Sequence, residues 1–517
     1  MTADLEATLL GILRTQLDDD AVGPDDDFYA SGGDSIIALR VVAAATRQGV
    51  PVELIDLLYY PTVNELAAEL AHRLPGPATV SAAEPFALLD TFDRALVPVG
   101  VADAWPASAL QVGLIYLCEQ SGDPALYHDL IGVEVVGRFD EDRFGAALTE
   151  LCRRHPALRS CFDLGTFAEP VQLVWPSTPV PLTVVAGTET DPATWRAAEL
   201  SRAIDWHAAP LFRCHVAVLD GSFHVMLAIH HAVIDGWSFA TAVTELLTIY
   251  DGLVEQRPPV LPAEPPGGHQ MFVQAERSAA ASADAARFWR AEADAPVMLL
   301  DRKRFGGAAN PAEMLSFPID PVVFGRLRTA ANRIGVPLKS LALGCHAWAL
   351  GRLTEREQGV VTGLTVNGRP EIDDADRMIG LYLNNVPLRL DSVAGDCLAV
   401  AREAMRAEQR IMPFRRYPLN HIEAMLGRPA FDVLFNFTHF HPYRDLDRLD
   451  AMKVASWWSY DKASLPLTVD FMIESRRFGT AVAASYDPDL LPSDRVRRFL
   501  RLYQDALHVA AEFGTDE

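Results

Sequence analysis

The chain of 517 residues is poor in cysteine and in basic residues. Its six cysteines are scattered without a Cys-x-x-Cys pair, so we expect neither disulfides nor a structural zinc site. Lys and Arg number 45 against 69 Asp and Glu, which gives a net charge of −24. A surface this acidic argues against binding to nucleic acid or to an anionic membrane.

Long apolar segments are also lacking. Charged residues or prolines interrupt the apolar stretches, so none fits a transmembrane helix. The N-terminus, MTADLEATLL, has no basic region of the kind that opens a signal peptide. We therefore expect a cytoplasmic protein. Half of the residues are hydrophobic, and the length exceeds that of one compact domain, so we expect several units with large cores.

Residues 1–75 have the pattern of a small all-α domain. The stretch DLEATLLGILRTQL has helical apolar spacing, and SIIALRVVAAATRQG and TVNELAAELAHRL predict further helices after an acidic loop. The stretch PGPATVSAAEP is rich in proline and alanine, which is typical of linkers. We assign residues 76–98 to a linker.

From residue 99 onward, predicted strands alternate with predicted amphipathic helices. The stretch FRCHVAVLDGSFHVMLAIHH predicts a hairpin with its turn at Asp220 and Gly221. A Pro-rich stretch, EQRPPVLPAEPPGG, divides this α/β region into two halves, residues 99–265 and 266–517. The second half has predicted helices near 284–296, 322–333, 337–353, 397–412 and 493–512, and predicted strands near 359–366, 383–390, 431–440 and 465–486.

Ser35 is the first candidate site residue. It follows Gly32, Gly33 and Asp34, and the glycines allow a tight turn that leaves the serine at the start of a helix. An ordinary N-cap serine is one interpretation. Because no His or Lys lies close in sequence to activate the hydroxyl, a modified serine is favoured over a nucleophile.

The stretch FYASGGDSIIALRVV resembles the core motif of peptidyl carrier proteins, in which the serine after G-G-D or G-G-H carries 4′-phosphopantetheine. Residues 1–75 also resemble that family in length, helix order and acidic loop. The resemblance implies 4′-phosphopantetheine covalently on Ser35, with a phosphopantetheinyl transferase as a partner. It also implies that Ile36 and Leu39 lie on the helix face that carrier domains offer to other domains.

A second candidate site lies in IHHAVIDGW, which places His230 and His231 at the end of an apolar strand. Side chains alternate along a strand, so we expect His231 to face a cleft and His230 to pack inward. A core turn, a metal site and an active site are all compatible with these residues. Adjacent strand histidines diverge and no metal-ligand spacing accompanies them, so we expect no metal.

The same stretch resembles the H-H-x-x-x-D-G motif of the condensation domains of non-ribosomal peptide synthetases, which belong with the chloramphenicol acetyltransferase-like acyltransferases. Further family motifs have similar stretches in the same order: WPASALQVGLIYL, RHPALRSCF, VTGLTVNGRP and MIGLYLNNVPLRL. The family's aromatic motif is resembled only faintly, by HQMFVQAE. The resemblance covers about residues 99–515. It implies a two-lobed α/β domain, each lobe chloramphenicol acetyltransferase-like, joined to a small all-α four-helix carrier domain.

The resemblance implies peptide-bond formation at the seam of the lobes, in a tunnel open at both ends. An acyl or peptidyl thioester on a donor carrier would pass to the amine of an acceptor aminoacyl-carrier. We expect His231 to deprotonate or position the amine and His230 to orient the turn. Gly236 would leave room for the pantetheine arm, and its N–H would help to stabilise the oxyanion.

Four further residues are expected to support this site. Asp235 is expected to be structural, because a buried carboxylate needs a partner. By resemblance the first choice for that partner is Arg159, and the second is Arg369. Ser108 and Asn384 are expected to line the tunnel.

Two other functions remain compatible with the same fold. An epimerase would need a carboxylate base opposite His231, although DGWS resembles the bond-forming members more closely. A non-catalytic docking platform would typically lack the second histidine. No adenylation domain is present in the sequence. We therefore expect a monomeric fragment whose partners are upstream and downstream synthetase modules, including an adenylation domain and an acceptor carrier domain.

Overall fold

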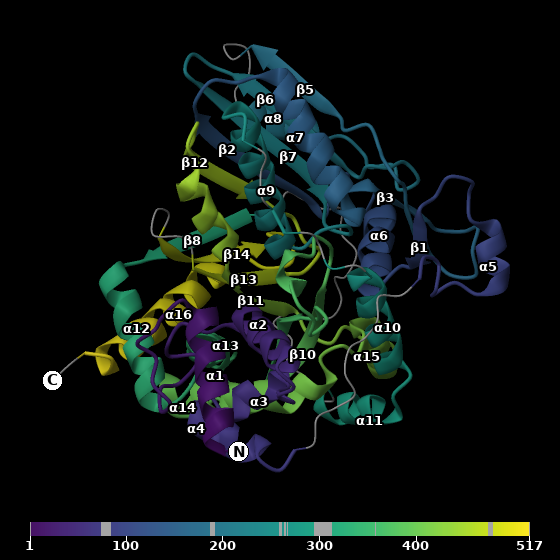
Figure 1. The fold of residues 1–517 in the computed structure, drawn as a ribbon. Coiled ribbons are helices and arrows are strands. Elements are labelled where there is room, and N and C mark those ends of the chain that lie inside the picture. Colours follow the sequence, from purple (N-terminus) through teal and green to yellow (C-terminus); the bar gives the residue numbers. More distant parts are fainter. Residues whose placement is uncertain are drawn as a thin grey trace.

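The structure is a computed structural model that describes residues 2–73, 84–186, 192–257, 261–262, 265, 267–293, 313–356, 358–473 and 479–515. Residues 76–83 of the predicted linker lie outside the described residues. So do parts of the Pro-rich stretch 255–268 and the end of the helix predicted near 284–296. Figure 1 shows the N-terminal helices, in purple, against the C-terminal half, with the strands of the N-terminal half above them.

The N-terminal domain is a cluster of four helices. They are α1 Thr2–Leu17, α2 Ser35–Arg47, α3 Leu54–Tyr59 and α4 Val63–Leu70. Apolar side chains from all four form one buried cluster, so the four-helix prediction is confirmed. Gly49, just past the end of α2, has φ +75°, a conformation that glycine adopts without strain.

A five-stranded sheet in the order β12-β2-β7-β6-β5 builds the N-terminal lobe. Its strands are β2 His128–Val136, β5 Leu182–Ala186, β6 Phe212–Val218, β7 Ser222–His230 and β12 Lys453–Tyr460. Helices α7 Glu141–Arg154 and α9 Gly236–Val254 cover one face of this sheet with a shared apolar core. The predicted hairpin at Asp220 and Gly221 is confirmed, since β6 and β7 are antiparallel neighbours.

Strand β12 reaches this sheet from the second half of the chain, which the sequence did not predict. It pairs antiparallel with β2, with Trp458 opposite Gly132. A Cβ on Gly132 would lie 2.2 Å from the Trp458 ring, so only glycine leaves room for the indole. The two halves of the chain therefore share a sheet at the seam between the lobes.

A six-stranded sheet in the order β10-β9-β11-β13-β14-β8 builds the C-terminal lobe. Its strands are β8 Glu313–Ile319, β9 Gln358–Asn367, β10 Leu383–Ser392, β11 Val433–His439, β13 Leu467–Ile473 and β14 Thr480–Tyr486. The segment predicted as strand at 465–486 is thus two strands, and residues 474–478 between them lie outside the described residues.

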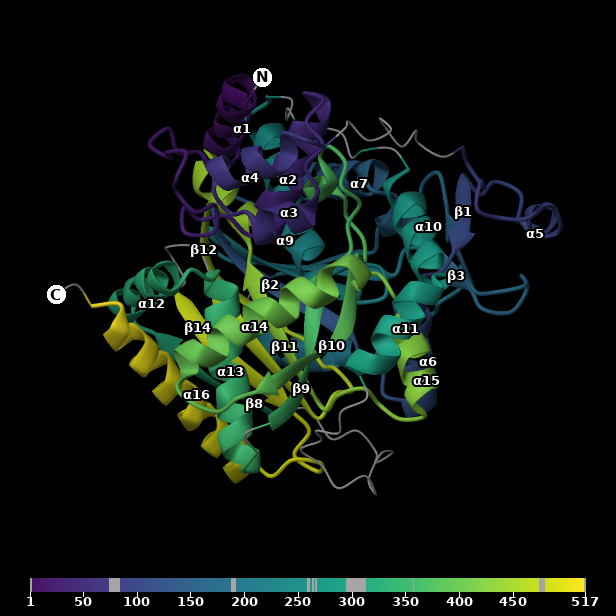
Figure 2. The same ribbon diagram turned by 90° about the horizontal axis from the view of Figure 1, so that it is seen from below.

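Helices α12 Pro321–Ile334, α13 Leu338–Thr354, α14 Cys397–Ile411 and α16 Ser493–Phe513 share one apolar core with this sheet (Figure 2). On the strands, the core side chains alternate with others that line a cavity, such as Thr468 and Asp470 on β13. The C-terminal sheet therefore separates the helix-covered core from the space between the domains.

A smaller sheet and further helices complete the described part of the two lobes. They comprise β1 Asp103–Pro106, β3 Ser160–Asp163, β4 Val171–Val174, α5 Thr91–Leu96, α6 Ala109–Ser121, α8 Pro192–Leu200, α10 Gly268–Ala280, α11 Ala283–Glu292 and α15 Leu419–Leu426. Residues 84–98 differ from the predicted linker: they form α5, and Leu89 packs in one apolar cluster with Leu173. Across the residues that can be described, no helix is long and apolar enough to cross a membrane.

Candidate active site between the carrier serine and the paired histidines

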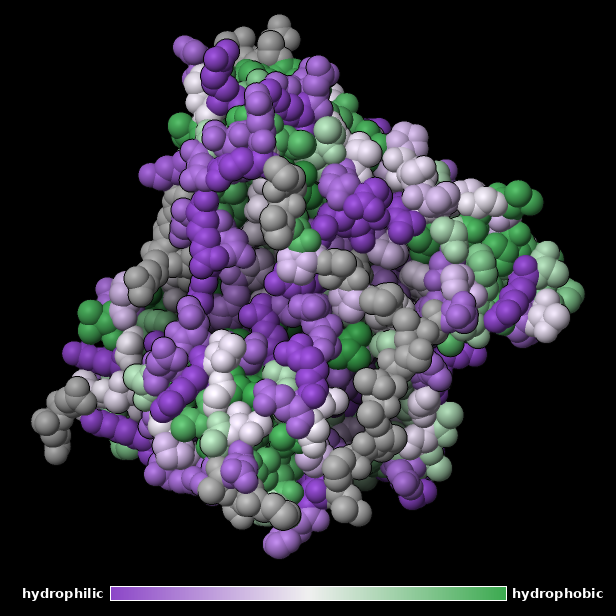
Figure 3. Space-filling view, viewed as in Figure 1, coloured by the Kyte–Doolittle hydropathy of each residue, from purple (hydrophilic) through white to green (hydrophobic). Residues whose placement is uncertain are grey.

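One large cavity lies where the four-helix domain meets the two lobes. Its volume is about 2640 Å³, and its lining includes Ser35, His231, Gly236 and Asn384. The molecular surface is hollowed in this region, with hydrophilic side chains around the hollow (Figure 3). The two sites that the sequence predicted separately are therefore brought to a single cavity.

Ser35 begins α2 and is exposed. The N-cap is Asp34 rather than the serine, because the Asp34 side chain accepts hydrogen bonds from the N–H groups of Ile36 and Ile37 at 2.9 Å. Gly33 allows the preceding turn, since a Cβ there would lie 2.5 Å from the Phe28 ring. An exposed hydroxyl at a helix N-terminus, open to a long cavity, fits the attachment of a phosphodiester-linked arm.

The start of α2 packs against residues of the two lobes. Ile36 and Leu39 are buried in an apolar cluster that also contains Trp237, and Phe440 packs against that cluster. The Arg40 guanidinium donates to the Asp376 carboxylate with an Nε–Oδ2 distance of 2.9 Å. The helix face predicted for partner contact therefore lies at the domain interface.

His231 is the histidine that lines the cavity. Strand β7 ends at His230, and His231 is the first residue of the following turn, where its N–H donates to the Tyr127 carbonyl at 2.8 Å. The sequence predicted from strand alternation that His231, and not His230, would face a cleft, and His231 does line the cavity. The structure shows that the turn, and not continued alternation, directs this side chain.

Asp129 on β2 holds the His231 ring. Its Oδ2 lies 2.7 Å from His231 Nδ1. A carboxylate accepts, so Nδ1 carries the proton of the neutral ring and Nε2 is left as an acceptor for substrate. Burial acts to lower the pKa of His231, but the charge and hydrogen bond of Asp129 raise it above its ordinary value.

Two further carboxyl groups line the same cavity. Burial and the charge of Asp129 raise the pKa of Asp461 to about 6. Burial and the charge of Asp461 raise the pKa of Asp470 to about 7. The sequence analysis missed Asp129, Asp461 and Asp470. Asp129 precedes His231 by 102 residues, and only the pairing of β2 with β7 brings the two together.

His230 is a packing residue. Its side chain is 2 % exposed, its Nδ1 accepts the Ala232 N–H at 3.0 Å, and its ring meets the Trp206 ring edge-on at 4.5 Å between centroids. Burial lowers the pKa of His230 well below its ordinary value. Its position agrees with the expected inward packing.

Asp235 is fully buried and all its contacts are structural. Its Oδ2 lies 3.0 Å from Arg369, and it also accepts the N–H groups of Ser238 at 2.8 Å and Tyr382 at 3.1 Å. The expected first partner, Arg159, is therefore wrong, and Arg369, the second choice, is correct. The guanidinium of Arg159 instead donates to the Trp175 carbonyl beside its own 3-10 turn.

The remaining predicted residues either line the cavity or support the structure around it. A Cβ on Gly236 would lie 3.2 Å from the Phe440 ring, so glycine keeps this part of the cavity open. Asn384 lines the cavity, but its amide donates to the carbonyls of Arg415 and Tyr417 at 2.9 and 2.7 Å. The placement of Ser108 in the tunnel is wrong: Ser108 is 1 % exposed and caps α6 through Gln111.

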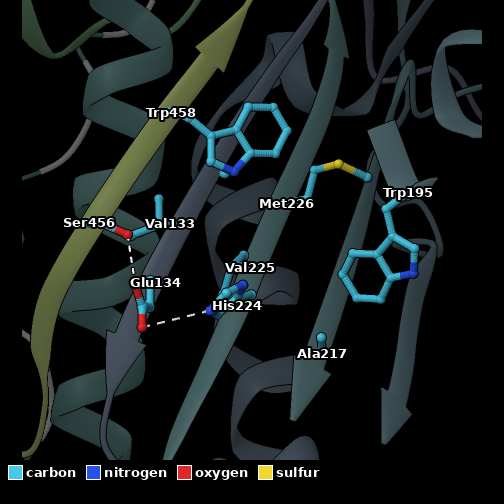
Figure 4. A pocket seen from close by; sticks show the side chains of 10 residues that line it. Val133, Glu134, Trp195, Ala217, His224, Val225, Met226, Ser456 and Trp458 are labelled. Atoms are coloured by element: carbon cyan, nitrogen blue, oxygen red, sulfur yellow. Dashed lines mark hydrogen bonds and ion pairs between the residues drawn. The ribbon is translucent and has the colours of Figure 1, made fainter. Parts of the chain in front are cut away.

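A second, smaller pocket of about 240 Å³ lies against the N-terminal sheet (Figure 4). Glu134 lines it, accepts the Ser456 hydroxyl at 2.7 Å and is 3.8 Å from His224. Trp195 and Trp458 close its sides. None of the predicted site residues lines this pocket, so the large cavity is the candidate active site.

The architecture is that of a carrier-dependent acyltransferase: a helical domain with a modifiable serine sits on a two-lobed α/β domain with a paired-histidine motif at the seam. Comparison with known families agrees. Residues 101–515 match the family model described as Condensation domain, and residues 7–70 match Phosphopantetheine attachment site. The chain belongs to the condensation-domain family of non-ribosomal peptide synthetases, and its carrier domain takes 4′-phosphopantetheine as a covalent cofactor.

Curated relatives are multidomain synthetases. AMB antimetabolite synthetase AmbE of Pseudomonas aeruginosa is 34% identical over 97% of this chain and 24% of its own length. Tyrocidine synthase 3 of Brevibacillus parabrevis is 27% identical over 84% of this chain and 6% of its own length. The chain thus spans about a quarter or less of these relatives.

Solved structures share the fold. The first condensation domain of the calcium-dependent antibiotic synthetase, in complex with a substrate analogue, aligns with a TM-score of 0.66 at 20% identity, over 80% of this chain and 97% of that one. The X-domain from teicoplanin biosynthesis aligns with a TM-score of 0.63 at 20% identity, over 79% and 96%. The two-lobed prediction is confirmed.

Proposed function

We propose that this chain joins the acyl group delivered on Ser35 to the amine of an acceptor aminoacyl-carrier, forming a peptide bond. One observation carries the proposal: Ser35 and His231 line one cavity, and Asp129 leaves Nε2 of His231 as an acceptor. An amine entering the cavity can therefore meet a basic nitrogen beside the acyl group.

The bound 4′-phosphopantetheine supplies the thiol that holds the acyl group as a thioester. In the reaction the C–N bond forms and the C–S bond breaks, and a proton passes from the amine towards sulfur. Nε2 of His231 accepts or orients that proton, as general acid–base residues do. The N–H of Gly236, at the start of α9, is the donor we assign to the developing oxyanion. His230, Asp235 and Arg369 act by holding the turn.

The wider partners are proposed on the same basis. A phosphopantetheinyl transferase would load Ser35. An adenylation domain would supply the donor, and an acceptor carrier domain would bring the amine. We propose a monomeric, cytoplasmic fragment of a longer synthetase, supported by the acidic composition and the short span relative to the curated relatives.

The test is a single-turnover assay on the full chain. Ser35 is loaded with a short aminoacyl-pantetheine by a phosphopantetheinyl transferase, an amine acceptor is added, and product is followed by mass. Amide formation that depends on His231 is expected. Absence of product with every acceptor, from a loaded and folded protein, would instead support a docking platform.

Epimerisation is the second candidate, because Asp461 and Asp470 place carboxyl groups in the cavity that His231 lines. An acid–base pair across a cavity could exchange the α-proton of the loaded aminoacyl group. Chiral analysis of the released amino acid distinguishes the two: retained configuration with amide formation supports condensation, and inverted configuration without amide supports epimerisation.

A further inference from the structure

The carrier domain contacts the condensation domain through the residue directly before Ser35. Oδ2 of Asp34 lies 2.5 Å from Nε2 of His441 and 3.4 Å from Nδ1 of His439. Both histidines lie at the junction of β11 with the 3-10 turn η5 His441–Arg448. We propose that His439 and His441 form a docking site that selects a carrier domain with a carboxylate immediately before its modified serine.

The two oxygens of Asp34 have separate roles. Oδ1 accepts the N–H groups of Ile36 and Ile37 and caps α2 within the carrier domain. Oδ2 is directed to the condensation domain and meets the histidine pair. A capping residue needs only one acceptor, which an asparagine or serine also supplies. The second oxygen therefore serves the contact between the domains and is dispensable for the helix.

The histidine pair is suited to an anion. Nη2 of Arg444 lies 3.4 Å from Nε2 of His439, and because a guanidinium only donates, that nitrogen must accept. Nδ1 of His439 then carries its proton towards Asp34. A histidine at position 34, as in carriers with G-G-H, offers one acceptor lone pair and cannot serve both donors.

Partial burial strengthens the electrostatic interaction between Asp34 and the two histidines. The side chains of Asp34, His439 and His441 are 16%, 22% and 13% exposed, so solvent screens them less than a surface ion pair. The His441 ring also meets the ring of Trp237 at 5.9 Å, nearly edge-on. Since Trp237 directly follows Gly236, the docking site adjoins the active-site motif.

A transition metal is the competing explanation for two histidines around a carboxylate. With metal–ligand bonds of about 2.0–2.1 Å, tetrahedral ligand atoms lie about 3.3 Å apart. The Asp34–His441 separation of 2.5 Å is shorter than this ligand spacing and indicates a direct hydrogen bond, whereas the 3.4 Å between Asp34 and His439 fits either arrangement. The geometry thus favours a direct contact, and a bridging metal is an outcome that the test must detect.

This inference rests on the proposed function, so the assay separates docking from chemistry. The full chain receives the same acyl group by two routes: attached to Ser35, or as a soluble thioester in excess. Asp34→Asn keeps the cap and removes the carboxylate. We expect it to slow the carrier-delivered reaction about tenfold, the effect of losing one hydrogen bond to a charged group, and to leave the soluble route unchanged.

A double-mutant cycle identifies the partner. His441→Phe keeps the aromatic contact with Trp237 and removes the donor, and we expect a similar loss on the carrier-delivered route alone. The combined variant should be no slower than either single variant, because both remove the same contact. Asp20→Asn removes an equal charge from an exposed position of the carrier and serves as the matched control, with no expected change.

Hydrogen exchange gives a readout that needs no activity. Amides of residues 433–448 should exchange faster in Asp34→Asn and His441→Phe than in wild type or Asp20→Asn. Equal slowing of both delivery routes, or no slowing of either, would overturn the docking role. A wild-type rate that falls with EDTA and recovers with Zn²⁺ would replace it by a bridging metal. Absence of amide by the soluble route would count against the proposed function and leave the exchange result to decide the docking site.

Discussion

Two aspartates stand in the same local arrangement, one in the carrier domain (the carrier end) and one in the paired-histidine turn (the catalytic end). Asp34 caps α2 directly before Ser35, and Asp235 caps α9 directly before Gly236. Each also has a cationic or imidazole partner on another element: Oδ2 of Asp34 meets His441, and Arg369 donates to both oxygens of Asp235.

The two aspartates differ in burial. Asp235 and Arg369 are at most 1% exposed, whereas Asp34 and His441 are 16% and 13% exposed and lie between two domains. A buried ion pair cannot open without leaving a charge uncompensated, but an interface pair can exchange its partners for water. We therefore infer that the Asp235 pair fixes the turn before Gly236 permanently, whereas the Asp34 pair holds the start of α2 reversibly.

The largest effect is expected at the carrier end. Ser35→Ala should abolish pantetheinylation completely while leaving the fold intact, because the hydroxyl is exposed and Asp34 supplies the cap. Intact-protein mass after treatment with coenzyme A and a phosphopantetheinyl transferase measures this. Ser31→Ala, on the same loop, is the control and should still be loaded. Loading of Ser35→Ala would make the carrier assignment wrong.

The next effect is expected at the catalytic end. His231→Ala should slow amide formation by up to 10²–10⁴-fold, the usual range for acid–base help. A loss at the lower end would indicate positioning, since a tethered thioester is reactive without a base.

His230→Ala is the matched variant for this comparison. It opens a void against Trp206 in a buried site, so it should lower the melting temperature. Circular dichroism of both variants shows whether a loss of activity comes from the chemistry or from unfolding. A folded His231→Ala protein at the wild-type rate would remove the catalytic role, and an equally inactive, fully stable His230→Ala protein would assign that role to the neighbouring residue.

Local sequence patterns predicted the parts of this comparison that depend on near neighbours. The glycine turn before Ser35 and the hairpin before His230 each arise from residues that are near neighbours in sequence, so the motifs were sufficient. The structure places His231 at the cavity as the sequence predicted, although the turn at His231, and not strand alternation, directs the side chain.

Contacts between distant strands and loops could not be predicted in this way. Strand β12 joins the N-terminal sheet, Asp129 reaches His231 across 102 residues, and Arg369 pairs with Asp235 across 134 residues. None of these pairings leaves a periodic signal, so the choice between Arg159 and Arg369 required the three-dimensional arrangement.

The third prediction tests the difference in burial directly. Asp235→Ala should cost roughly 3–5 kcal/mol of unfolding free energy, because Arg369 is left buried and unpaired. Asp396→Ala removes an exposed N-cap of α14 that has no ion pair, and it should cost about 0.5–2 kcal/mol. Denaturant unfolding measures both. An unchanged unfolding midpoint for Asp235→Ala, with sharply reduced turnover, would make Asp235 a chemical participant.

The smallest effect concerns the pKa of His231. Asp129 raises the pKa of His231, and the reaction needs Nε2 unprotonated, so the wild-type rate should fall as the pH drops through that raised pKa. Asp129→Asn keeps an acceptor for Nδ1–H but removes the charge. The pKa of His231 should then fall, and the acid limb of the pH–rate profile should move to lower pH.

At alkaline pH the Asp129→Asn protein should retain its rate to within about tenfold, because the ring is still oriented and neutral. The soluble thioester route is the proper assay, since it avoids any change in carrier docking. Glu134→Gln, on the same strand but facing the smaller pocket of Figure 4, should leave the acid limb in place. A lower rate with an unshifted acid limb would show that Asp129 only orients the ring and that its charge does not set the pKa of His231.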